Sequence, residues 1–180
     1  MLFRSVRWPP RGSVPDRAPS DGRAVNDGSI VLDLRWGDRR FLLMGDVEDD
    51  VDPTLLADGI GDAGRVDVLK VAHHGSATAT SDPFIAATRP LVAIASAGSG
   101  NPYGHPAAST IARLEDAGAT VLRTDADGSV TVSKRVTTGW AAPGSGSIAN
   151  GTRCSGPSAT ISRRPPPRSA FAGSRIEALS

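Results

Sequence analysis

The stretch Val68-Leu69-Lys70-Val71-Ala72-His73-His74-Gly75-Ser76 decides the fold. Its first half belongs to the compact run of residues 66–71, which is typical of a strand buried in a sheet. The run leads directly into two histidines, a glycine and a serine, so polar side chains follow the end of the strand. In open α/β sheets, binding sites collect in the loops that leave the strand ends. The stretch therefore predicts an α/β domain with a site beside this strand.

Strand and helix patterns alternate on both sides of this stretch. Residues 29–34 and 41–44 predict a hairpin that turns at Trp36-Gly37-Asp38. Residues 91–96 form another compact run and predict a second buried strand. The remaining expected elements are a short helix at 53–57, a helix from Ser81 or Asp82 to Thr88, a helix from Pro106 to Gly118, and a closing hairpin at 121–132 around Asp127-Gly128. This order predicts an α/β layered domain.

The length of 180 residues allows one domain with tails. Residues 1–25 are rich in Arg, Pro, Ser and Gly, and we expect an irregular lead-in there. Residues 26–136 carry the periodic signals of the folded domain. Residues 137–180 contain Gly/Ser runs and Pro165-Pro166-Pro167 with almost no apolar pattern, which predicts a disordered tail.

Charge and cysteine content exclude few functions. The net charge is +1, which argues neither for nor against nucleic-acid binding. The single cysteine, Cys154, cannot form an internal disulfide. No run serves as a signal peptide, and none approaches the ~20 apolar residues that span a bilayer. The chain taken alone is therefore expected to be soluble.

Polar residues follow three of the expected strands. Phe41-Leu42-Leu43-Met44-Gly45-Asp46 ends in a carboxylate, and His73 and His74 follow the next strand. Asp46 on its own is equally typical of a strand-end turn, and a lone histidine is more often structural. A carboxylate together with imidazoles suits zinc, manganese or iron, so we expect Asp46, His73 and His74 to form a metal site. The motif leaves open which of the two histidines faces the metal.

The third strand leads into the glycine-rich loop of residues 97–106, which contains Asn101 and His105. This loop ends where a helix begins, and backbone N–H groups at a helix N-terminus favour an anion such as phosphate. A plain Gly/Pro connector would have a similar composition. All three histidines of the chain nevertheless fall in strand-end loops, as does Asp46, which favours one common site.

These residues do not complete a metal site. A structural zinc takes four protein ligands, a catalytic zinc takes three and a water, and a two-metal hydrolase needs more. The chain contains no second set of carboxylates and imidazoles that would supply the rest. The sequence therefore predicts part of a metal site.

In this order, the motifs resemble the metallo-β-lactamase domain at the C-terminal end of ComEC-type competence proteins. The resemblance covers roughly residues 24–134 and includes three further motifs. They are Asn26-Asp27-Gly28-Ser29, Asn101-Pro102-Tyr103-Gly104-His105-Pro106 and Thr124-Asp125-Ala126-Asp127-Gly128. The resemblance implies the second half of an αββα sandwich, with a mixed sheet and two main helices.

The resemblance also implies roles for the site residues. Asp46 matches a metal-bridging aspartate, and His73 or His74 matches a late metal-ligand histidine. His105 and Asn101 are placed in the catalytic centre, with His105 supporting a ligand or contacting the substrate phosphate. The implied activity is zinc- or manganese-dependent hydrolysis of a phosphodiester in DNA, without a small-molecule cofactor. The implied role is degradation of one DNA strand during uptake through a membrane channel.

One departure divides the functional hypotheses. The family's His-x-His-x-Asp-His motif is missing, since no histidine precedes His73, and the segments of the membrane channel are missing too. The chain is thus expected to be either half of a phosphodiesterase that needs the N-terminal half of the domain, or a degenerate module that binds metal or nucleic acid weakly. In both cases we expect the isolated chain to be inactive. A half-sheet leaves a face and an edge uncovered, so we also expect poor solubility or oligomerisation when the chain is expressed alone.

Overall fold

The computed structural model describes residues 2–14, 16–134 and 159–164. It contains a six-stranded mixed sheet in which the strands follow one another in chain order. The first three strands pair antiparallel, and the third to the sixth run parallel. The strands are β1 (Leu2–Trp8), β2 (Val31–Trp36), β3 (Arg39–Leu43), β4 (Val68–Lys70), β5 (Val92–Ala95) and β6 (Thr120–Arg123).

Short helices connect these strands. They are α1 (Gly22–Asn26), α2 (Asp52–Ala57), α3 (Asp82–Thr88), α4 (Ala108–Asp116) and α5 (Thr124–Asp127), and η1 (Ala72–Gly75) is a tight turn after β4. The elements predicted at 29–34, 41–44, 53–57, 66–71, 81–88, 91–96 and 106–118 all have counterparts here. The α/β fold with a mixed sheet is therefore confirmed.

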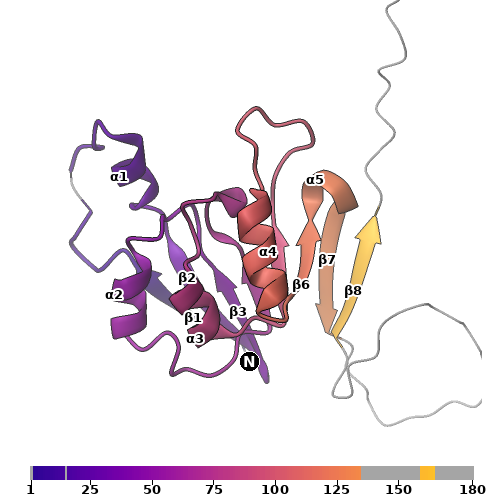
Figure 1. Ribbon diagram of the computed structural model, residues 1–180. Coiled ribbons are helices and arrows are strands. Elements are labelled where there is room, and N and C mark those ends of the chain that lie inside the picture. The colour runs from indigo at the N-terminus through magenta and orange to yellow at the C-terminus, as the bar shows by residue number, and fades with distance from the viewer. Residues whose placement is uncertain (1, 15, 135–158, 165–180) are drawn as a thin grey trace, which may run out of the picture.

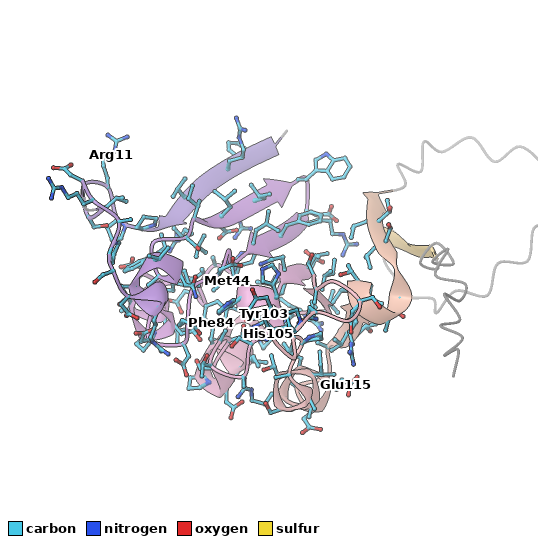
Figure 2. The ribbon with its side chains drawn as sticks, turned by 90° about the horizontal axis from the view of Figure 1, so that it is seen from above. Arg11, Met44, Phe84, Tyr103, His105 and Glu115 are labelled. Carbon is cyan, nitrogen blue, oxygen red and sulfur yellow. The ribbon has the colours of Figure 1, made fainter. Side chains whose placement is uncertain are left out.

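Helices α2, α3 and α4 all lie on one side of the sheet (Figures 1 and 2). The core lies between them and the strands. Leu42, Leu69 and Ala93 stand side by side on β3, β4 and β5 and are fully buried. Phe84 of α3 and Leu114 of α4 are equally buried and belong to the same core as these strands. Each fully buried side chain of this size contributes roughly 1.5–3 kcal/mol, so this layer supplies much of the stability.

The other face of the sheet is also apolar. The register places Leu34, Phe41 and Val92 in one row across that face, together with Val68. Leu34, Phe41 and Val92 are partly exposed. Because an apolar sheet face is stable when a second layer covers it, this open face is a surface suited to packing.

The C-terminal pairing differs from the sequence prediction. The hairpin expected at 121–132 is wrong: β7 (Ser129–Lys134) pairs with β8 (Ala159–Arg164) in a separate two-stranded sheet. The cause is local, because the Asp127 carboxylate accepts the backbone N–H of Arg123 at 2.8 Å and closes the single turn of α5. Gly128, at φ +74°, then redirects the chain away from β6.

Two other predicted boundaries change. The segment 1–25, expected to be irregular, contains β1 and most of α1. The segment 137–180, expected to be a disordered tail, contains the six residues of β8. The remainder of that tail, with Cys154, lies outside the described residues. Periodicity did not predict β1, because its apolar residues alternate with polar and charged ones at the edge of the sheet; the family resemblance alone implies a strand, at Val6-Arg7-Trp8.

A buried carboxylate ties two helices of the covering layer together. Asp52 at the start of α2 is fully buried, and its Oδ2 accepts the backbone N–H of Ser81, the residue before α3, at 2.7 Å. Burial raises the pKa of Asp52 from an ordinary value of 3.8 to about 6, against the opposing effect of the Ser81 hydrogen bond. The folded state therefore holds this proton more tightly than the unfolded state does.

This shift predicts a pH dependence of stability. Because the pKa is raised on folding, the stabilisation is present below about pH 4 and is lost as the pH rises through about 6. This pKa shift of about two units corresponds to about 3 kcal/mol in the free energy of unfolding. Asp52→Asn keeps the acceptor and cannot ionise, so urea unfolding should find it gaining up to about 3 kcal/mol over the wild type between pH 4 and 7. A stability difference that stays constant over this pH range would contradict the assignment.

Candidate functional site

The candidate site lies where the parallel strands end. Since β3, β4 and β5 run parallel, their carboxyl ends meet at one edge of the sheet. Asp46 follows β3, His73 and His74 follow β4, and His105 lies in the loop after β5. The structure thus brings together, from three loops, the residues that the sequence singled out.

The turn after β4 has an unusual backbone. His73, His74 and Gly75 have φ values of +41°, +55° and +86°, three left-handed residues in succession. This region costs a non-glycine residue roughly 1–2 kcal/mol. Hydrogen bonds hold the turn: His73 N–H donates to Gly45 O at 3.1 Å, and Ala107 N–H donates to Gly75 O at 2.8 Å. The turn is therefore fixed between the loops that follow β3 and β5.

His74 faces Asp46. The His74 Nδ1 lies 2.6 Å from the carbonyl oxygen of Ser96, and because a carbonyl only accepts, Nδ1 carries the hydrogen. In the neutral ring the lone pair is then on Nε2, which lies 3.6 Å from Asp46 Oδ1. In this tautomer of the neutral ring, an imidazole lone pair faces a carboxylate oxygen. This is an arrangement that attracts a cation.

Lys70 supplies positive charge to this pair. Its Nζ donates to Gly45 O at 2.7 Å and lies 3.4 Å from Asp46 Oδ1. Burial lowers the pKa of Lys70 below its ordinary 10.5, while the Asp46 carboxylate opposes that shift. Lys70 therefore balances the charge of Asp46, at the cost of its own partial desolvation.

His73 has a different partner. Its Nδ1 lies 2.7 Å from Oε1 of Glu48, whose side chain is 6% exposed. Oε2 of Glu48 accepts the Thr78 hydroxyl at 2.9 Å, and Oε1 accepts the Asn26 amide at 3.3 Å. The Asp27 carboxylate accepts the backbone N–H of Glu48 at 2.9 Å. The Asn26-Asp27 motif thus supports Glu48, and Glu48 orients His73.

His105 lies beside His73, with their ring centroids 5.2 Å apart. Burial, and then the neighbouring His73 and His74, lower the pKa of His105 below its ordinary 6.5. His105 is therefore neutral at pH 7. A neutral imidazole at this position can accept or donate one hydrogen bond at the edge of the site.

Asn101 uses its side chain within its own loop. Its amide nitrogen donates to Gly98 O at 2.9 Å and to His105 O at 2.6 Å. Its amide oxygen accepts the backbone N–H groups of Tyr103 at 3.2 Å and His105 at 3.1 Å. Two donors and two lone pairs exhaust the capacity of an asparagine side chain. Asn101 thus shapes the loop that presents His105, and its catalytic role stays a prediction.

The donor set fits a zinc-type metal in chemistry but not in number. Two ligands of a tetrahedral zinc, each about 2.0–2.1 Å from the metal, lie about 3.3 Å from each other. The 3.6 Å between His74 Nε2 and Asp46 Oδ1 is close to this value. In the described part of the chain, no three His, Cys, Asp or Glu side chains converge to hold a metal. Asp46 and His74 thus fit as two ligands of a centre that needs more.

Sequence reasoning missed Glu48 and Lys70 as site residues. Each of them has a signal in the sequence. Glu48 follows Asp46 by two residues, and Lys70 is the one charged residue of β4. Their importance depends on burial and on contacts from other loops, which the sequence alone does not give.

The chain is thus an α/β protein with an Asp/His pair at the carboxyl edge of its parallel strands. It is 36% identical over 110 residues to ComE operon protein 3 of Bacillus subtilis (strain 168), covering 61% of this chain and 14% of that protein. It is 38% identical over 110 residues to Recombination protein 2 of Haemophilus influenzae, with the same coverage. It is 33% identical over 114 residues to Competence protein ComA of Neisseria gonorrhoeae, covering 62% of this chain and 16% of that protein.

The similarity is confined to a small part of the relatives. The matched region spans 14–16% of their length. No protein-family profile matches the chain. The names of the relatives point to competence and recombination, and the similarity links this chain to such proteins.

The contact between the β4 turn and the loop after β5 can be tested at Gly75. A Cβ at Gly75 would lie 2.7 Å from Cβ of Pro106, and the residue has φ +86°. Gly104 is a matched control, because its φ is +70° but a Cβ there meets nothing within 4 Å. Gly75→Ala should therefore cost about 1–3 kcal/mol more than Gly104→Ala in urea unfolding. Equal costs would mean that the two loops do not pack as described.

Proposed function

We propose that this chain supplies one half of a metal-dependent phosphodiesterase centre that acts on DNA during competence-related uptake. The observation that carries the proposal is the Asp46–His74 pair, in which two electron-pair donors converge at the edge of the parallel strands. The similarity to a named competence protein and a named recombination protein supports DNA as the substrate.

Asp46 and His74 would hold the metal, through Oδ1 and Nε2. Zinc or manganese suits one carboxylate and one imidazole. Bound there, the metal would polarise a phosphoryl oxygen and lower the pKa of water. The Ser96 carbonyl keeps the His74 ring in the required tautomer, as outer partners of metal-bound histidines commonly do. Glu48 likewise fixes the His73 ring through Nδ1, so His73 Nε2 would be available to bind the metal or to contact the substrate.

The remaining ligands would come from another segment. The open apolar face of the sheet, with Leu34, Phe41 and Val92 in one row, is a suitable surface for that segment. The N-terminal half of the domain, implied by the family resemblance, is the proposed partner, and a membrane channel is the proposed setting. Among the described residues, no helix is both long and apolar enough to span a bilayer.

A second candidate function is a non-catalytic module that binds metal or nucleic acid weakly. The lack of a third converging ligand within the described residues favours it for the isolated chain. Hydrolysis of a model phosphodiester with added zinc or manganese tests whether the isolated chain is itself active. Activity that disappears in Asp46→Ala would favour a complete enzyme, and inactivity agrees with either a half-centre or the non-catalytic module.

Calorimetric titration of the purified chain with zinc and with manganese tests the half-centre. We expect one metal per chain, with affinity reduced at least tenfold by Asp46→Ala and by His74→Ala, a typical loss on altering a metal site. Asp116→Ala removes an exposed carboxylate from the far end of α4 and should leave binding unchanged.

Two results would contradict the proposal. One is the absence of binding, and the other is binding that is indifferent to both Asp46 and His74. In either case the Asp46–His74 pair would be an ordinary polar contact between two strand-end loops.

A further inference from the structure

A cavity of about 480 Å³ opens beside His74, at the end of β5. Its walls include His74, Ser96, Asn101, Tyr103 and His105. The volume lies within the roughly 300–1,000 Å³ of small-ligand pockets. The cavity is therefore large enough for a ring-sized group and shares a histidine with the Asp46–His74 pair.

One wall of this cavity carries an exposed aromatic pair. Tyr103 is 79% exposed, and its ring is nearly parallel to that of His105, with an angle of 19° and centroids 6.2 Å apart. Figure 2 shows the two side by side. The Asn101 side chain accepts the backbone N–H groups of both residues, so the loop holds the pair in place. Tyr103 thus offers a positioned aromatic surface without contributing to the core.

The lining excludes some ligands. None of the residues that line the cavity is Lys, Arg, Asp or Glu, so no permanent charge faces it. A phosphate group would find no cationic side chain there. A flat, neutral ring with polar edges matches aromatic and amide or imidazole walls better, because bases stack on aromatic side chains irrespective of sequence.

We propose that this cavity binds a nucleobase of single-stranded DNA, with the Tyr103 ring stacking against the base. The inference rests on the proposed function and gives its centre a substrate-positioning subsite. His74 both lines the cavity and faces Asp46. Since one sugar joins a base to its phosphate, a base in the cavity places the adjacent phosphate beside the Asp46–His74 pair. Bases in a duplex are stacked and paired, so the subsite selects unpaired DNA.

Binding of two labelled oligonucleotides to the full chain tests this inference. One is an oligothymidylate, and the other is an abasic strand with the same number of phosphates. Fluorescence anisotropy is measured in EDTA and low salt, so that no metal contributes. We expect the oligothymidylate to bind roughly tenfold more tightly than the abasic strand, the usual contribution of a stacked base. Tyr103→Ala should abolish that preference, and Tyr103→Phe, which keeps the ring, should retain it.

Several results would overturn the inference. They are equal binding of both strands, a preference that survives Tyr103→Ala, and no detectable binding of either strand. The side chain of Tyr103 is exposed, and circular dichroism verifies that each variant remains folded. Because the assay excludes metal, its failure leaves the metal titration of Asp46 and His74 unaffected. Conversely, a base preference without metal binding would retain the subsite and reject the half-centre.

Discussion

The site depends on one backbone constraint, the left-handed turn that follows β4. His73 N–H donates to Gly45 O, and Gly75 O accepts Ala107 N–H. These two bonds fasten the turn to the loops after β3 and β5, whose strands are parallel neighbours of β4. In this turn His73 faces Glu48 and His74 faces Asp46. The strain of positive φ at His73 and His74 is offset by these hydrogen bonds and by those of the two imidazoles.

The polar groups of the site are organised as pairs of a functional atom and a fixed partner. Ser96 fixes His74, Glu48 fixes His73, and Asn101 fixes the loop that carries His105. Ser96 and Glu48 lie in other loops than the histidines they contact, and Asn101 lies in the loop of His105 itself, so the side chains are oriented before any ligand binds. Preorganisation of this kind reduces the cost of binding a cation or a substrate. What the described residues lack is a third converging metal ligand, and the open apolar face of the sheet is where a further layer could provide it.

Local signals in the sequence were sufficient for the central strands and for α3 and α4. Compact apolar runs predict β4 and β5. Pro83 marks the start of α3, and Gly118 follows the end of α4. The pairing of β7 with β8 could not be predicted, because the strands are separated by a long stretch without apolar periodicity. The sequence also could not tell which of His73 and His74 faces Asp46. That depends on the positive φ of both residues and on the Ser96 carbonyl, which bonds the His74 ring. Both features depend on contacts between residues far apart in the sequence, which periodicity does not reveal.

The site stands on the His74 ring, which bonds Ser96 O through Nδ1 and turns Nε2 toward Asp46. Two-dimensional ¹H–¹⁵N NMR of the three histidine rings, before and after zinc addition, tests it most directly. We expect neutral His74 to carry its hydrogen on Nδ1, and we expect zinc to shift the Nε2 resonance of this ring strongly. A neutral His74 ring that carries its hydrogen on Nε2, or a ring whose nitrogen resonances do not change with zinc, would contradict the proposed role of His74 as a metal ligand.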